Sequence, residues 1–182
     1  LNRVNIEVKS SFKKGTGTLI TKRSNIINNK TITGISSTQN DSKISLIGVR
    51  DKPGVAASIF KPLSKNFINV DMVVQNISSN GKETDLTFTV KNEDATKTER
   101  LLKNNKKIKF KSMLIKKNVS KLSIIGVGMI TTPGVTYRMF QALAKKNINI
   151  QVISTSEIKI SVVVDEKYTE LAVRSLHEEF DL

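Results

Sequence analysis

The sequence predicts an α+β protein made of two ferredoxin-like βαββαβ sandwiches, with the first copy inserted in the second. Three observations lead to this fold class. The chain contains an internal duplication, each copy alternates strand-like and helix-like segments in the same order, and the second copy lacks one strand that a segment ahead of the first copy can supply.

The duplication is visible in segments of near-identical sequence. The repeated segments are residues 43–49 and 121–127, residues 52–55 and 132–135, and residues 66–70 and 146–150. The second copy has a slightly longer loop ahead of its Pro-Gly pair. Two related units are therefore expected in place of a single domain.

Each copy predicts the same order of elements. Apolar, partly alternating runs indicate strands, and apolar residues at helical spacing follow each Pro-Gly pair. In the first copy we expect strands at residues 44–49, 68–77 and 84–90, with helices after the Pro-Gly pair and near residues 93–104. In the second copy we expect strands at residues 122–127, 148–156 and 158–164, with helices after the Pro-Gly pair and near residues 167–180.

Proline and threonine residues affect where the first helix of each copy is expected to begin and end. Proline suits the first helical position, and Thr132 is expected to be the N-cap in the second copy. Pro62 falls inside the first helix, where a missing N–H and a steric clash cost roughly 3 kcal/mol. We therefore expect a kink or an early stop near Lys61.

The last strand of each copy decides the topology. Residues 109–116 can complete the first copy, whereas the second copy ends at Leu182 with nothing left to complete it. Residues 31–39 predict a short strand ahead of the first copy, and we expect that strand to complete the second. The predicted domains are residues 41–118 for the first copy and residues 30–40 plus 119–182 for the second, after a separate segment at residues 1–29.

Composition excludes several classes of function. The chain has no cysteine, which removes disulfides, thiolate metal sites and thiol nucleophiles together. An apolar run of 18 or more residues is absent, so no membrane partner is expected. With no secretory signal pattern at the start, a cytoplasmic protein is the simplest interpretation.

The net charge of +14 admits two interpretations. It could mark a nucleic-acid-binding face, with 30 Lys and Arg against 16 Asp and Glu. Aromatic residues are only 5% of the chain and no RNA-binding aromatic signature accompanies the lysines. The joint abundance of Lys, Asn and Ile favours drift in a genome rich in A and T, and no nucleic-acid partner is expected.

Longer segments resemble a known family. Residues 51–54, 69–76 and 84–90 resemble the first ACT domain of bacterial aspartate kinases, and residues 134–135, 148–164 and 172–180 resemble the second. The match covers nearly all of residues 31–182, and its most specific part is Ile-Ser-Thr-Ser-Glu-Ile at residues 153–158. Residues 4–12 and 15–20 resemble the last strand and loop of the kinase domain, so residues 1–29 are interpreted as its remnant.

The resemblance implies a function. The parent enzyme would phosphorylate L-aspartate with ATP and Mg²⁺, and this chain would be its feedback-sensing region, without catalytic residues, metal or cofactor. Gly15-Thr16-Gly17 lacks the Lys and helix start of a phosphate-binding loop, and the lone His177 has no nucleophile near it in sequence. A fragment is favoured over a natural small subunit. The implied partners are free lysine and/or threonine, a second copy of the chain in a homodimer, and a catalytic subunit or domain.

The residue types support binding of an amino acid. A helix start after a Pro-Gly turn offers free N–H groups to a carboxylate, Gly54 lets the backbone approach closely, and Asp51 can accept from an ammonium. The candidate effector-binding residues of the first copy are Asp51, Lys52, Pro53, Gly54, Val55, Ala56, Asn69, Val70, Asp71 and Gln75. Those of the second copy are Val135, Thr136, Asn149, Ile150, Thr155, Ser156 and Glu157.

Two further expectations concern these candidates. Strand alternation places Asn69, Asp71 and Gln75 on one face, with their apolar neighbours on the opposite, core-like face. The second copy has Thr131 and Gln151 in place of Asp51 and Asp71, which favours lysine at the first site and threonine at the second. Alternatively, several of these residues serve only turns and strand ends, or the module belongs to another ACT-regulated enzyme.

Overall fold

The computed structural model describes residues 6–12, 14–20, 31–77 and 81–182. The chain forms two units, Leu1–Lys30 and Thr31–Leu182. Among the helices in the described ranges, none is long and apolar enough to cross a membrane.

The first unit contains a small antiparallel hairpin. It pairs β1 (Ile6–Val8) with β2 (Thr18–Ile20), and both strands are exposed along their length. The segment that resembles the end of a kinase domain is thus a hairpin where the structure describes it. Residues 1–5, 13 and 21–29 of that interpretation lie outside the described residues.

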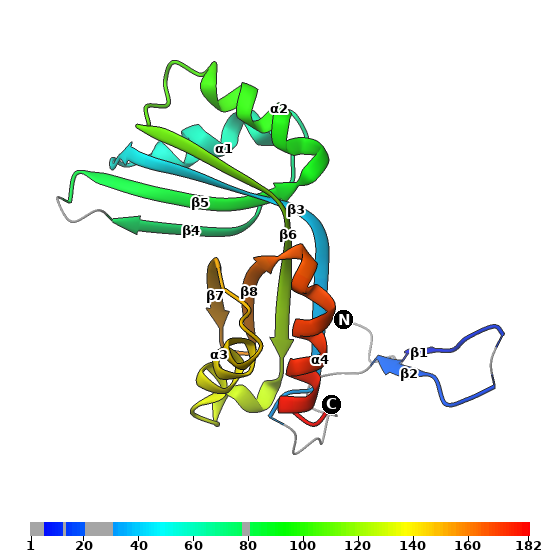
Figure 1. Cartoon of the computed structure of the whole chain (residues 1–182). Coiled ribbons are helices and arrows are strands. Elements are labelled where there is room, and N and C mark those ends of the chain that lie inside the picture. The colour runs from blue at the N-terminus through cyan, green and yellow to red at the C-terminus, as the bar shows by residue number, and fades with distance from the viewer. Residues whose placement is uncertain (1–5, 13, 21–30, 78–80) are drawn as a thin grey trace. The chain divides into compact units, whose positions relative to one another are not determined.

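The second unit is one six-stranded antiparallel sheet in the order β4-β5-β3-β6-β8-β7 (Figure 1). Its two central strands, β3 (Gly34–Arg50) and β6 (Ser112–Ile125), each run through both repeats. We call residues 41–117 lobe one and residues 31–39 plus 119–182 lobe two. Asn40 and Asn118 lie between the lobes.

Both lobes have the predicted order of elements. Lobe one adds α1 (Val55–Lys65), β4 (Asp71–Ile77), β5 (Glu83–Lys91) and α2 (Asn92–Lys103). Lobe two adds η2 (Val127–Ile130), α3 (Val135–Lys145), β7 (Val152–Ser156), β8 (Lys159–Asp165), η3 (Glu166–Tyr168) and α4 (Thr169–Glu179). The α+β fold class is confirmed.

The pairing of β3 confirms that the first copy is inserted in the second. Its first half belongs to lobe two, with Gly34 opposite Ile125 and Thr38 opposite Lys121. Its second half belongs to lobe one, where residues 43–47 pair with residues 112–116 of β6. The domain limits given above remain predictions, because strand pairing does not say where an independent domain would end.

One expectation about β6 was wrong. Residues 109–116 and 122–127 were expected as two strands, but residues 112–125 form one continuous strand. A left-handed Asn118, with φ of 57°, lets the strand bend at the junction without ending, and Asn40 has φ of 61° in β3. Asparagine tolerates this conformation better than other residues with a Cβ.

Each lobe has its own apolar core between sheet and helices. Lobe one buries Val55, Ile59 and Leu63 of α1, and lobe two buries Val135, Met139 and Leu143 of α3, at the spacing that the helix period requires. A third, smaller cluster lies at the junction of the lobes. It contains Met72, Val119, Val152 and Val163, with Val74 packed against it.

Two expectations about helix ends were also wrong. The N-caps are Gly54 and Gly134, so Thr132 is not a cap and each proline precedes the helix. Of the two alternatives for Pro62, the early stop near Lys61 was wrong, because helix α1 continues through Pro62 to Lys65, and the kink stays a prediction. Burial of Ile59 and Leu63 on both sides of the proline stabilises the helix by roughly 1.5–3 kcal/mol for each side chain.

Candidate functional site

The start of α3 in lobe two is an open helix end. Gly134 has φ of 87° and ψ of −4°, a left-handed conformation that a glycine adopts without strain. No side chain in the described part of the molecule caps this helix, and its first intrahelical bond runs from the Arg138 N–H to the Gly134 carbonyl, 3.0 Å. The N–H groups of the first turn therefore point outward without an intrahelical acceptor.

A groove of about 430 Å³ lies against this helix end, and we call it the α3 groove. Its walls come from η2, from the loop that precedes α3, from the start of α3 and from the β7–β8 hairpin. The lining residues are Met129, Ile130, Thr132, Pro133, Gly134, Val135, Thr136, Thr155, Ser156, Glu157 and Ile160. Free amides, hydroxyls and one carboxylate thus face a space large enough for an amino acid.

The structure brings most of the second copy's candidates together here. Val135, Thr136, Thr155, Ser156 and Glu157 all line the α3 groove. Asn149 and Ile150 do not, because they precede β7 at the C-terminal end of α3.

Met129, Ile130 and Thr132 were missed by the sequence analysis. Their signal was the longer loop ahead of the second Pro-Gly pair, which folds into η2 and forms one wall of the groove.

The start of α1 in lobe one has the same backbone form. Gly54 has φ of 84°, and the described residues supply no side-chain cap. The Val55 N–H donates to the Lys52 carbonyl over 3.1 Å, which closes the turn, and the Asp51 N–H donates to the Lys82 carbonyl over 2.9 Å. Pro53 and Ala56 complete this predicted loop, so both repeats present an uncapped helix end.

The other candidates of lobe one lie apart from that loop. Asn69 and Val70 follow the C-terminal end of α1 and line a groove there with Phe60 and Ser64. Gln75 lies further along β4, toward the strand end that pairs with Thr84. Within a single chain, the loop and the strand residues do not form one site.

The expected alternation along this segment was wrong as well. Ile68 and Val70 pack in the core of lobe one, but Met72 and Val74 pack in the junction cluster on the other side of the sheet. The cause is a bulge: the register of β4 against β5 shifts between Asp71 and Val74, and Met72 has φ of 50°. Such a bulge re-aims the side chains that follow it.

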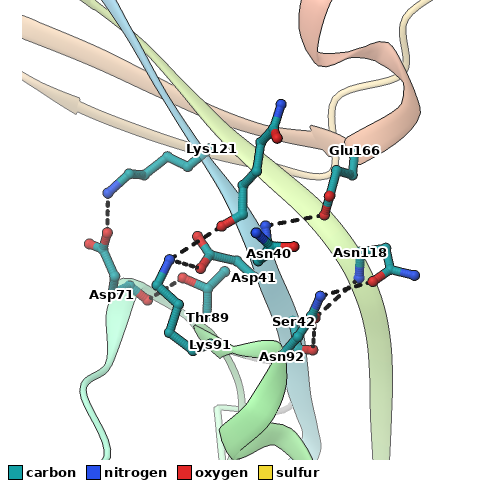
Figure 2. Close-up of polar contacts among 11 residues, drawn as sticks. Asn40, Asp41, Ser42, Asp71, Thr89, Lys91, Asn92, Asn118, Lys121 and Glu166 are labelled. Carbon is teal, nitrogen blue, oxygen red and sulfur yellow. Dashed lines mark hydrogen bonds and ion pairs between the residues drawn. The ribbon is translucent and has the colours of Figure 1, made fainter.

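Asp71 forms a contact between the lobes. Its carboxylate makes an ion pair with Lys121 of β6, drawn in Figure 2, and its second oxygen accepts from the Met72 N–H over 2.8 Å. Burial raises the pKa of the Asp71 carboxyl, but the bonds from Lys121 and Met72 and the charges of Lys121 and Lys159 lower it, and the net pKa lies below its ordinary value.

A second groove, of about 400 Å³, surrounds this ion pair, and we call it the junction groove. It is lined by Val70, Asp71, Met72, Val73, Lys121, Ser154, Thr155, Ser156, Lys159 and Ser161. Thr155 and Ser156 line both this groove and the α3 groove, so the β7–β8 hairpin separates the two. Lys121 and Lys159 had no signal in the sequence, because only the folded sheet places them beside Asp71.

Polar contacts also hold the bend itself (Figure 2). Asn118 accepts from the Asn92 side-chain amide over 2.8 Å, and the Asn40 N–H donates to Glu166 over 3.2 Å. Lys91 of lobe one pairs with the buried Asp41 over 2.7 Å and also donates to the Gln39 carbonyl of lobe two over 3.3 Å. The two lobes are thus joined by hydrogen bonds, by ion pairs and by a small apolar cluster.

Fold and grooves together define a class of protein, a tandem of ferredoxin-like domains with ligand-sized polar grooves at a helix start and at the junction between repeats. The sequence pattern of the ACT domain matches residues 44–105 and 122–180. The chain belongs to the ACT domain family, in the tandem form found in the regulatory region of aspartate kinases.

Similar proteins support that placement. The chain is 48% identical over 181 residues to an aspartate kinase of Pseudomonas fluorescens, a match that covers 98% of this chain and 44% of that enzyme. The regulatory subunit of aspartate kinase from Thermus thermophilus, crystallised in a ligand-free form, has a TM-score of 0.75 and 36% identity, covering 83% of this chain and 99% of that one. A chain in a crystal structure of aspartokinase alpha and beta subunits has a TM-score of 0.74 and 42% identity, with the same shares covered. The chain therefore spans less than half the length of the full kinase that it matches.

Proposed function

We propose that this chain is the effector-sensing part of an aspartate kinase, which would transfer phosphate from ATP to L-aspartate in a catalytic domain or subunit elsewhere. Its similarity to regulatory subunits supports the regulatory role. The observation that carries the proposal is the uncapped start of α3 facing a polar groove of about 430 Å³. ATP and Mg²⁺ would be bound by the catalytic part.

The chemistry of the α3 groove suits a zwitterion. A carboxylate placed at the start of α3 would receive the N–H groups of the first turn and the favourable end of the helix dipole. Glu157 supplies a carboxylate on the opposite wall for an ammonium group, and Thr136, Thr155 and Ser156 supply hydroxyls. We propose lysine and/or threonine as the effectors, since both end the pathways that begin with phosphorylated aspartate.

The mechanism requires a difference in affinity. An effector inhibits only if it binds the low-activity arrangement more tightly than the active one. The strands at the edges of the six-stranded sheet are β4 and β7, and a second copy of the chain could pair there in a homodimer. An amino acid held next to such an edge would then alter how two chains, and the kinase domains attached to them, are placed.

Isothermal titration calorimetry of this chain with lysine, threonine, methionine and glycine tests the proposal. We expect saturable heat with lysine or threonine and none with glycine. Glu157→Gln should weaken binding in the α3 groove at least about tenfold, because a hydrogen bond to a charged group is lost. Glu178→Gln, an exposed carboxylate on α4 away from the groove, is the matched control and should bind as the unaltered chain does.

The lobe-one loop is tested separately with Asp51→Ala. A loss of one binding event with the second preserved would assign that event to the loop. Absence of heat with every amino acid of the aspartate family would contradict the proposed function.

A further inference from the structure

The junction groove differs in charge from the α3 groove. Two lysines, Lys121 and Lys159, face a single carboxylate, that of Asp71. The remaining polar lining consists of hydroxyls, which are neutral. The groove therefore carries one surplus positive charge, whereas the α3 groove has the carboxylate of Glu157 and no lysine or arginine in its lining.

Lys121 is held in place over this groove. Its side chain is only 16% exposed, while that of its partner Asp71 is 58% exposed. Lys121 lies opposite Val163 on β8, one of the residues of the junction cluster. A lysine stem packed on apolar surface with its ammonium at the edge has little freedom to leave.

The acceptor that a cationic ligand would need already has two partners. Asp71 receives the Lys121 ammonium on one oxygen and the Met72 N–H on the other. A ligand with a side-chain ammonium would have to share the Asp71 carboxylate with Lys121, and it would be repelled by both Lys121 and Lys159. A carboxylate entering the groove would be attracted by both lysines and could accept from the hydroxyls.

We propose that the junction groove binds an amino acid without a cationic side chain, and that Lys121 is the residue that determines this specificity by acting as an internal ammonium. The proposal rests on the proposed amino-acid-sensing function and adds a site within one chain, between its two lobes. In this arrangement threonine fits the groove and lysine does not. Lysine, where it acts, would bind elsewhere, contrary to the expectation that Asp71 forms a lysine site.

The groove also lies where binding can be transmitted. Its walls come from β4 of lobe one and from β6, β7 and β8 of lobe two, so a ligand there contacts both lobes. The junction itself is the bend at Asn40 and Asn118, which small polar contacts hold (Figure 2). A bound carboxylate that shares the Lys121 ammonium with Asp71 would weaken the Asp71–Lys121 pair and so change the contact between the lobes.

The test compares calorimetric titrations of threonine and lysine into the full chain and into Lys121→Met. The unaltered chain should bind threonine in the junction groove. Lys121→Met should weaken threonine and strengthen lysine, each by about tenfold, because one unit charge is removed within a few ångströms of the ligand. Lys121→Arg, which keeps the charge, should keep the preference for threonine.

Two further variants make the test specific. Lys159→Met removes the other lysine of this groove and should also weaken threonine, while Glu157→Gln reports on the α3 groove. Lys116→Met is the matched control. It removes a lysine from the same strand that pairs with Asp165 over 3.2 Å and does not line the groove, so the preference should not change.

The outcomes separate the two proposals. If the chain binds threonine or lysine but Lys121→Met and Lys159→Met leave their ratio as in the Lys116→Met control, the junction site is refuted and the sensing function stands. If neither the chain nor any variant binds an amino acid, both are refuted. Should Lys121→Met fail to fold by circular dichroism, Lys121→Gln provides the same comparison with a polar side chain.

Discussion

Replacing Gly126 with alanine should destabilise lobe two selectively. Gly126 has φ of −176°, an extended backbone that any residue adopts, so the consequence is steric. A Cβ there would lie 2.0 Å from the Thr31 carbonyl oxygen and 2.7 Å from the Ile32 Cα, both backbone atoms that cannot rotate away. The segment at residues 31–32 must therefore move.

The magnitude follows from what that segment buries. Ile32 is 2% exposed and belongs to the core of lobe two. Overpacking a core costs about 1–3 kcal/mol, and loss of a buried isoleucine side chain costs about 2–5 kcal/mol. Since the segment can shift partly, we expect the free energy of unfolding to fall by about 2–4 kcal/mol.

Urea denaturation followed by circular dichroism measures this loss, and Gly34→Ala is its control. A Cβ on Gly34 meets nothing within 4 Å, although Gly34 lies opposite Ile125, the neighbour of Gly126. That variant should be neutral or slightly more stable. Hydrogen exchange should become faster in residues 34–38 of Gly126→Ala. Equal stability of the two variants would refute the claim that the chain ahead of lobe one is an integral part of lobe two.

Three further predictions concern single residues. Pro62→Ala should raise the free energy of unfolding by about 1–2 kcal/mol in urea titrations. The reason is that the penalty of roughly 3 kcal/mol for a proline inside a helix exceeds the benefit that proline gives by stiffening the unfolded chain. An unchanged or lower urea midpoint would contradict this. Lys43→Thr should stabilise the fold at pH 7, since burial and then the like charge of Lys116 lower the Lys43 pKa. The gain in the free energy of unfolding should shrink as pH rises through that lowered pKa toward 10.5, and a gain independent of pH would speak against it. The Asp71–Lys121 pair should contribute stability above about pH 4 and lose it as pH falls through the depressed folded pKa of Asp71. Asp71→Asn should therefore reduce the loss of melting temperature at acid pH in a series of thermal melts. An equal loss in the variant would exclude the pair as the source of the acid sensitivity.

Most of the architecture could be predicted because its signals are local. A helix or strand is marked by the periodicity of neighbouring residues, and a duplication repeats those marks. The insertion followed from counting strands, since a second copy without its last strand must take one from residues ahead of the first copy. The errors about Pro62 and Thr132 arose where packing or backbone conformation outweighed local preference.

The candidate site could be predicted only in part. For the α3 groove, the relevant residues lie in two short segments that the βαββαβ order always brings together. In lobe one the predicted loop and strand residues do not come together, since a bulge at Met72 changes which side chains of β4 lie on each face of the sheet. A one-residue irregularity of this kind leaves no periodic trace in sequence.

The sequence by itself determined that this chain is a tandem of two related sandwiches with a helix after each Pro-Gly turn, because each of those properties depends on residues close together in the chain. Only the tertiary structure decided that Asp71 is paired with Lys121, that Lys159 lies beside them, and that a groove joins the two lobes. Such contacts depend on the bends at Asn40 and Asn118, where small changes in backbone angle decide which distant side chains meet.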